Sequence, residues 1–266
     1  MKKLLFLLMV FSIPALAQEN LVSERVLYKH GDTSLRGHMV FDKTIEGKRP
    51  AVLVIHEWWG LNEYARRRAD QMAELGYVAF ALDMYGAGVW LKSASEASVW
   101  AGKFYEDRQL MRDRAKAGLK ILLEHKLTDT SRVAVIGYCF GGSVALELAR
   151  SGADISGVVS FHGGLSTPNP EDANNIRCPI LVLHGGDDPN VPPAEVEAFQ
   201  KEMRDAGVDW QMNIYGEAVH AFTNPAAGDD NSKGAAYNEK ADKRSWQAMK
   251  DFFVEIFGTG DGLKVN

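Results

Sequence analysis

Several features that mark specialised classes of protein are scarce in this sequence of 266 residues. It has only 2 cysteines, which excludes a small fold held together by several disulfides. Lys and Arg total 30 against 35 for Asp and Glu, so the chain lacks the basic excess that nucleic-acid partners favour. No apolar run reaches the roughly 18 residues that a membrane-spanning helix needs. We therefore expect no nucleic-acid partner and, in the mature chain, no membrane association.

Motifs that hold metals or nucleotides are also missing. The 7 histidines include no pair spaced i, i+4, and the segment that starts at His56-Glu57 like a zinc-binding helix has Gly60 in place of the second histidine. Neither glycine-rich phosphate-binding pattern, G-x-G-x-x-G or G-x-x-x-x-G-K-[ST], occurs. The sequence therefore predicts no metal site and no cofactor. The three arginines at 66–68 are expected to form a solvated helix face rather than an anion site.

The amino terminus has the pattern of a secretory signal peptide. Two lysines precede an apolar run at 4–11, and residues 15–17, Ala-Leu-Ala, form a small-residue cleavage signal. A buried strand is the alternative interpretation, since the run is too short to span a bilayer. We expect residues 1–17 to be removed, which leaves a mature chain that starts at Gln18 and is secreted or, in a bacterium, periplasmic.

The rest of the chain has an ordinary globular balance, with 46% hydrophobic and 24% charged residues. Short apolar runs alternate with amphipathic helical segments, a pattern typical of a mostly parallel sheet with helices on both faces. No repeat or long linker divides the chain, so residues 18–266 are predicted to form a single α/β domain that opens with an antiparallel hairpin. Strands are expected at 21–28, 34–41, 51–55, 77–82, 132–136, 157–161, 180–183 and 209–215. Helices are expected at 62–75, 109–124, 140–150, 193–206 and 243–257, and residues 86–106 are expected to be irregular.

The loops after the strands are where such a sheet carries its chemistry. After the strand at 132–136 the sequence reads Gly137-Tyr138-Cys139-Phe140-Gly141, which is G-x-nucleophile-x-G between a strand and a helix. The helix N-terminus would stabilise the thiolate of Cys139. The alternative is an inert buried cysteine beside a glycine-rich turn, but the order of strand, turn and helix favours a nucleophile.

A nucleophile of this kind needs a histidine as base and an acid to orient that histidine, in the chain order nucleophile, acid, histidine. His220 follows the strand at 209–215 and is the candidate base. Asp187 and Asp188 follow the strand at 180–183, and either satisfies the order. A structural hydrogen bond for His220 and a turn role for Asp188 before Pro189 are the alternative interpretations.

These motifs resemble the dienelactone hydrolase family of the α/β-hydrolase superfamily. The family has a cysteine in the elbow, its acid in a D-x-x-V-P context and its histidine in an H-x-F context; this chain has Cys139, then Asp188-Pro189-Asn190-Val191-Pro192, then His220-Ala221-Phe222. The early strand is followed here by Glu57-Trp58-Trp59-Gly60, and the next strand by Asp83-Met84-Tyr85, again as in the family. The likeness runs from about residue 21 to 257, and it favours Asp188 over Asp187 as the acid.

The resemblance implies an α/β-hydrolase fold and a hydrolase that cleaves a small ester or lactone through an acyl-thiolate intermediate, without a cofactor. It implies an oxyanion hole made by the backbone N–H groups of Phe140 and Trp58, and a Glu57 that controls the ionisation of the thiol. Tyr85, His162 and Trp59 are expected to contact the substrate.

One departure bears on the substrate. The enzyme that named the family binds its substrate carboxylate with arginines, one of them shortly after the histidine, but here that stretch reads His220-Ala221-Phe222-Thr223-Asn224-Pro225. An uncharged or larger ester is therefore expected in place of dienelactone. The same residues would also serve a thioesterase or a peptide hydrolase, and a non-enzymatic protein with a reactive thiol remains an alternative. The sequence leaves open whether the protein is a monomer or a dimer.

Overall fold

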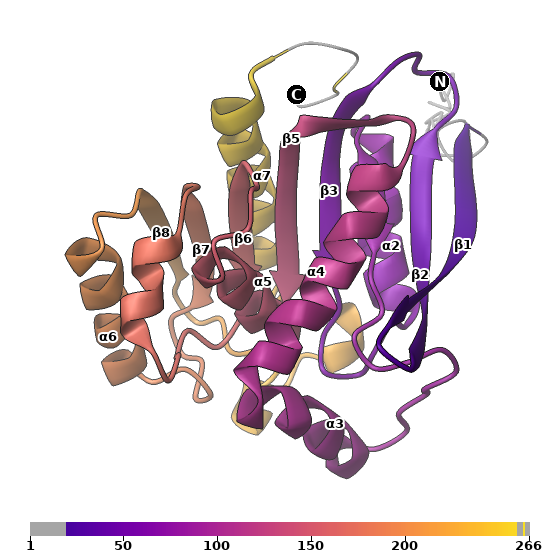
Figure 1. The fold of residues 1–266 in the computed structure, drawn as a ribbon. Coiled ribbons are helices and arrows are strands. Elements are labelled where there is room, and N and C mark those ends of the chain that lie inside the picture. The colour runs from indigo at the N-terminus through magenta and orange to yellow at the C-terminus, as the bar shows by residue number, and fades with distance from the viewer. Residues whose placement is uncertain (1–19, 260–262, 264–266) are drawn as a thin grey trace, which may run out of the picture.

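The computed structural model describes residues 20–259 and residue 263, so the predicted signal peptide lies outside the described residues. Eight strands form one sheet in the order β1-β2-β4-β3-β5-β6-β7-β8 (Figure 1). The strands are β1 Leu21–His30, β2 Thr33–Asp42, β3 Arg49–Ile55, β4 Val78–Ala81, β5 Thr128–Tyr138, β6 Gly157–Phe161, β7 Ile180–Gly185 and β8 Trp210–Tyr215. The helices are α2 Glu63–Glu74, α3 Ala94–Glu106, α4 Arg108–Glu124, α5 Phe140–Arg150, α6 Pro193–Asp205 and α7 Glu239–Phe257.

The sheet is mostly parallel, as the sequence predicts. β1 and β2 form the opening hairpin, and β2 also pairs antiparallel with β4. The remaining neighbours, from β4 through β3, β5, β6 and β7 to β8, all pair in parallel. Parallel strands end at the same edge, so the loops after β3, β5, β7 and β8 meet there.

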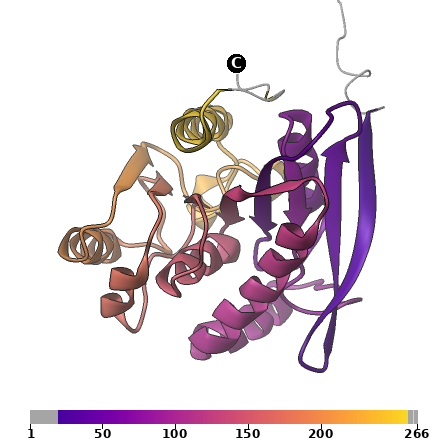
Figure 2. The same cartoon turned by 45° about the horizontal axis from the view of Figure 1, so that its top comes forward.

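Two hydrophobic cores cover the two faces of the sheet. Residues alternate between them along β3: Leu53 packs into one core and Val52 and Val54 into the other. The first core takes its helical residues from α3, α4, α5 and α6, and the second from α2 and α7. Figure 2 shows α7 on one side of the sheet and α4 on the other. The continuous apolar sequence of β3 is explained by this burial on both faces.

The segment at 86–106 is where the fold prediction is wrong. More than half of it is the regular helix α3, which begins with a capping box: Ser93 accepts from the N–H of Glu96, and the Glu96 side chain accepts from the N–H of Ser93. α3 buries only the narrow stripe of Ala97, Ala101 and Phe104, while Val99 on another face is 64% exposed. A stripe this narrow gives a weak helical period, because apolar and polar residues are mixed on the remaining surface.

The described residues include no helix that is both long and apolar enough to cross a membrane.

Candidate active site

The turn that carries Cys139 joins β5 to α5 and is strained. Cys139 is the N-cap residue of α5 and has a φ of +55°, a left-handed backbone conformation that residues other than glycine rarely adopt. The neighbouring glycines allow the chain to pass: a Cβ on Gly137 would lie 1.9 Å from the carbonyl oxygen of Gly141, and a Cβ on Gly141 would lie 2.3 Å from that of Ile55. The turn therefore holds the thiol above the sheet edge, at the N-terminus of a helix.

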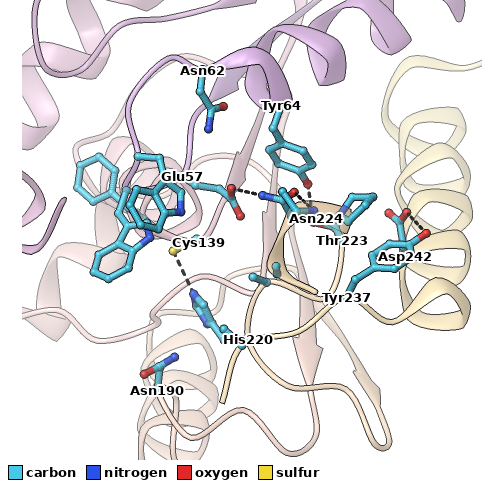
Figure 3. Close-up of a pocket in the computed structure, with 18 of the residues that line it drawn as sticks. Glu57, Asn62, Tyr64, Cys139, Asn190, His220, Thr223, Asn224, Tyr237 and Asp242 are labelled. Atoms are coloured by element: carbon cyan, nitrogen blue, oxygen red, sulfur yellow. Dashed lines mark hydrogen bonds between the residues drawn. The ribbon is translucent and has the colours of Figure 1, made fainter. Parts of the chain in front are cut away.

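The structure brings the thiol, an imidazole and a carboxylate into one line of contacts. The Nε2 atom of His220 lies 3.0 Å from the Sγ atom of Cys139, and its Nδ1 atom lies 2.8 Å from the Oδ2 atom of Asp188. Figure 3 shows His220 pointing at the sulfur. Asp188 is buried, whereas its rival Asp187 is exposed, so Asp188 is the acid that reaches the imidazole.

Hydrogen bonds to backbone groups hold in place the two loops that carry Asp188 and His220. The other carboxylate oxygen of Asp188, Oδ1, accepts from the N–H of Asn190 at 2.8 Å. His220 lies in a long loop, and its N–H and C=O bond to Gly234 and Ala236 further along that loop. The acid and the imidazole are therefore fixed independently of each other.

The electrostatics of this line favour a charged imidazole. Burial alone would lower the pKa of His220, but the Cys139 sulfur and the Asp188 carboxylate outweigh it and raise the pKa well above its ordinary value. The His220 imidazole therefore favours its charged form, in contact with the Sγ atom of Cys139 on one side and the Asp188 carboxylate on the other.

Glu57 lies beside this line, in the loop after β3. It is 3% exposed, and its Oε2 atom accepts from the Nδ2 atom of Asn224 at 2.6 Å (Figure 3). Burial raises the pKa of Glu57 to about 7, although the Asn224 hydrogen bond and the positive charges of His220 and Arg68 oppose the rise. The carboxyl can therefore change its charge near neutral pH next to the thiol and imidazole.

These groups open into a cavity of about 1420 Å³. Trp58, Trp59 and Phe140, three residues singled out in the sequence, line it together with Cys139. The two tryptophan rings contact each other edge to face, with centroids 5.2 Å apart. From there the cavity extends along α2 and across to α7, past Tyr64, Arg67, Arg68, Gln71, Tyr105, Lys233, Tyr237 and Asp242.

Tyr85 and His162 are not among the residues that line this cavity, and their contact with substrate stays a prediction. The hydroxyl of Tyr85 instead donates to the carbonyl of Trp58 at 3.0 Å. His162 is 1% exposed; its Nδ1 atom accepts from the N–H of Cys139 at 3.2 Å, and its Nε2 atom lies 2.7 Å from the hydroxyl of Thr223. Burial lowers the pKa of His162 well below its ordinary value, so the ring is neutral and donates to Thr223. Both side chains therefore hydrogen-bond to backbone groups of the site, the carbonyl of Trp58 and the N–H of Cys139, and hold that backbone in place.

The structure corrects the expectation for the arginine run, because Arg68 is not solvated. It is 6% exposed, and its guanidinium donates to the Asp242 carboxylate at 2.6 Å and to the carbonyl of Thr223 at 2.8 Å. It also donates to the hydroxyl of Tyr64, which lies 2.6 Å from the Thr223 hydroxyl. Arg68 thus joins α2 and α7 to the segment that holds Asn224.

Asn224 is the site residue that the sequence alone does not single out as a partner of Glu57. Asn224 follows His220 by four positions, so the sequence places it close to the candidate base. Its contact with Glu57 depends on how the loop after β8 packs in the folded chain. In the part of the chain that the structure describes, no group of three or more His, Cys, Asp or Glu side chains is arranged so that it could hold a metal ion.

Comparison with known proteins identifies the family of this chain. Residues 35–257 match the profile of the dienelactone hydrolase family. Protein usf of Aquifex pyrophilus is 30% identical over 239 residues, which cover 88% of this chain and 99% of that protein. A protein of Aquifex aeolicus (strain VF5), provisionally named a carboxymethylenebutenolidase, is 28% identical over 87% of this chain and 98% of its own length. Among solved structures, a dienelactone hydrolase-like promiscuous phosphotriesterase from metagenomic libraries superposes with a TM-score of 0.85 at 41% identity, covering 90% of this chain and 100% of that one.

Proposed function

Because this chain belongs to the dienelactone hydrolase family of carboxylic ester hydrolases, we propose that it cleaves a small ester or lactone with Cys139 as nucleophile, His220 as proton carrier and Asp188 as the acid that orients His220. The observation that carries the proposal is the pair of contacts made by one imidazole, 3.0 Å to the sulfur and 2.8 Å to the carboxylate. A histidine held in this way exchanges a proton with the thiol while keeping one ring orientation.

The proposed reaction has two steps. The Cys139 thiolate attacks the carbonyl carbon, a C–S bond forms, and the carbonyl π electrons move to the oxygen, which accepts from the N–H groups of Phe140 and Trp58. Collapse of this intermediate breaks the ester C–O bond, and the leaving alkoxide takes the proton of His220. Water then gives a proton to His220 and its hydroxide to the acyl carbon, which releases the acid and restores the thiolate.

Glu57 is proposed to control the charge of this pair. Its carboxyl has a pKa of about 7, because it is buried, and it interacts with His220. An ionised Glu57 attracts the charged imidazole of His220 and a protonated Glu57 does not. The charge of Glu57 is therefore proposed to set how readily His220 gives up its proton.

The test is turnover of 4-nitrophenyl acetate combined with mass spectrometry of the intact protein. We expect Cys139→Ala and His220→Ala each to abolish turnover, and the wild type to carry an acetyl group on Cys139 early in the reaction. Cys178→Ala is the matched control, since Cys178 is the other free cysteine and is buried at 5% exposure away from the cavity lining. Turnover that survives in either triad variant would contradict the proposal, and oxidation of Cys139 by peroxide without ester turnover would favour the reactive-thiol alternative.

The substrate is proposed to be an uncharged ester or one larger than dienelactone. Asn224 stands four residues after His220, in the stretch where the family's founding enzyme has an arginine, and it is already bonded to Glu57. The cavity of about 1420 Å³ exceeds the roughly 300–1,000 Å³ of common small-molecule sites. A panel of oxygen esters, thioesters and peptides of increasing acyl size would separate esterase, thioesterase and peptidase activity at the same thiol.

Hydrolysis of phosphate triesters is a second candidate, because the metagenomic structure at 41% identity is described as a promiscuous phosphotriesterase. The same thiolate would attack phosphorus and expel a phenolate, and water would then cleave the P–S bond. Paraoxon belongs in the substrate panel for this reason. Activity that remains in Cys139→Ala would exclude this route.

Export is proposed from the amino-terminal pattern at 1–17. Peptide sequencing of the protein expressed from the full gene in a bacterium is expected to find Gln18 as the first residue of a periplasmic product. A retained Met1 would contradict both cleavage and export.

A further inference from the structure

His56 is a fully buried histidine next to the site that the proposed reaction does not use. It follows β3 directly and is 0% exposed. Its Nε2 atom accepts from the N–H of Met84 at 3.2 Å, so this nitrogen carries no proton. Burial lowers the pKa of His56, which keeps the ring neutral with one proton. That proton is therefore on Nδ1, which donates to the carbonyl oxygen of Glu57 at 2.5 Å.

This hydrogen bond fixes the peptide that contains the N–H of Trp58. The Glu57–Trp58 bond is trans, and in a trans peptide the C=O and the following N–H lie in one plane and point in opposite directions. A side chain that holds the Glu57 oxygen on one side therefore turns the Trp58 N–H to the other side. Trp58 lines the cavity with Cys139, and the proposed function requires its N–H to face that cavity.

Two further bonds stiffen the same loop. The N–H of Gly60 donates to the Glu57 oxygen at 3.2 Å, and the Tyr85 hydroxyl donates to the next carbonyl, that of Trp58, at 3.0 Å. The His56 ring also packs against Tyr85, with centroids 4.9 Å apart, and stacks on Phe140 at 6.1 Å. His56 thus contacts Phe140, which carries one N–H of the proposed oxyanion hole, and the carbonyl of the peptide that carries the other, the N–H of Trp58.

We propose that His56 is a positioning residue for the oxyanion hole, in which the Nδ1–H···O=C bond to Glu57 aims the Trp58 N–H at the oxygen of the reacting carbonyl. The proposal rests on the proposed function. Its particular consequence is that His56 acts on reactions that create an oxyanion and leaves the thiol itself unaffected. Acylation by an ester creates one, because the carbonyl π electrons move to oxygen. Alkylation of the same sulfur by iodoacetamide creates none, because iodide leaves a saturated carbon.

The experiment measures both reactions at Cys139 in His56→Leu, which has no donor, and in His56→Gln, which keeps one. The pre-steady-state burst with 4-nitrophenyl acetate gives the acylation rate, and loss of free thiol gives the iodoacetamide rate. Removal of one oxyanion donor lowers rates by about 10²–10³, so loss of its support is expected to lower acylation in His56→Leu by roughly 10- to 100-fold. The alkylation rate and its pH profile are expected to stay within about twofold of the wild type, and His56→Gln is expected to recover most of the acylation rate.

Two results would overturn the assignment: an unchanged acylation rate in His56→Leu, or a parallel fall of acylation and alkylation, which would mean general damage to the thiol site. If His56→Leu does not fold, Tyr85→Phe makes the same test on the neighbouring carbonyl, with a several-fold fall in acylation alone as the expected result. A wild-type protein whose Cys139 is alkylated but never acylated would instead contradict the proposed function, so the two failures are distinguishable.

Discussion

Glu57 is a buried carboxyl, and folding shifts its pKa far enough for a stability measurement to detect the shift. Its pKa is about 7 in the folded protein against an ordinary value of 4.5, because burial penalises the charged form. The folded state therefore prefers the protonated carboxyl. The resulting contribution to stability is fully present below pH 4.5 and is lost as the pH rises through 7.

We expect Glu57→Gln to abolish this dependence, since glutamine stays neutral and its side-chain oxygen still accepts from Asn224. Between pH 4.5 and 7.5 the wild type should lose about 3 kcal/mol of unfolding free energy relative to the variant. Urea unfolding of both proteins at the two pH values gives the difference directly, and other titrating groups cancel in it. Parallel pH dependence in the two proteins would show that Glu57 does not ionise in a buried setting.

At the scale of the elements, the sequence predicts α5 and β6 with both ends correct and misses α3. Phe140–Arg150 is apolar and follows the glycine-rich elbow, and Gly157–Phe161 is a short apolar run after a Gly-containing turn. The exposed apolar residues of α3 obscure its period, and its start was marked only by the Ser93 and Glu96 pair. Strong periodicity is thus readable from sequence, whereas a helix that lies over the surface is better recognised by its cap.

The C-terminal end of α5 is fixed by a buried ion network, which gives a prediction for the stability of this helix. Arg150 is 1% exposed and donates to both carboxylate oxygens of Glu202 on α6, at 2.7 and 2.8 Å, and to Glu147 at 3.2 Å. Arg150→Met should lower the unfolding free energy by about 3–5 kcal/mol, because the buried Glu202 carboxylate loses its partner, while Glu147 keeps its pair with Arg112.

Catalytic turnover at low temperature should persist in this variant, since Arg150 lies at the opposite end of α5 from Cys139, about 16 Å along the helix axis. Urea unfolding measures the first effect and 4-nitrophenyl acetate turnover the second. The control is Lys120→Met, which removes an exposed pair with Glu124 and is expected to change stability by less than about 0.5 kcal/mol. An equal effect of the two substitutions would contradict a buried network.

At the scale of the whole molecule, the parallel sheet explains which parts of the site the sequence can predict. Cys139, Asp188, His220 and Glu57 follow different strands, and parallel strands that end at one edge bring such residues together. The supports behind them were not predictable, because Arg68, Thr223 and His162 meet only when α2, α7 and the loop after β8 pack against one another. Their roles follow from tertiary contacts, and a lone sequence pattern such as the three arginines carries no information about them.

The same packing leaves Arg67 as a guanidinium in the cavity with no hydrogen bond or ion pair to the residues that the structure describes. Arg66, one position earlier, points elsewhere: it donates to the carbonyl of Leu61 at 3.0 Å and lines a separate pocket near β1 and β2. Among esters larger than dienelactone, Arg67 should therefore favour one whose acyl arm ends in a carboxylate, while Glu63, which also lines the cavity, offsets part of the attraction.

Arg67→Gln is expected to raise the KM for 4-nitrophenyl hemiglutarate roughly two- to five-fold at low salt, the range that corresponds to an exposed ion pair. The KM for the neutral 4-nitrophenyl valerate should not change, and added salt should remove the difference between the proteins because it screens the exposed charges. Arg66→Gln has the same loss of charge on the same helix and is the matched control. If both variants shift the KM for the anionic ester equally, the effect comes from net charge alone and Arg67 has no particular place in the cavity.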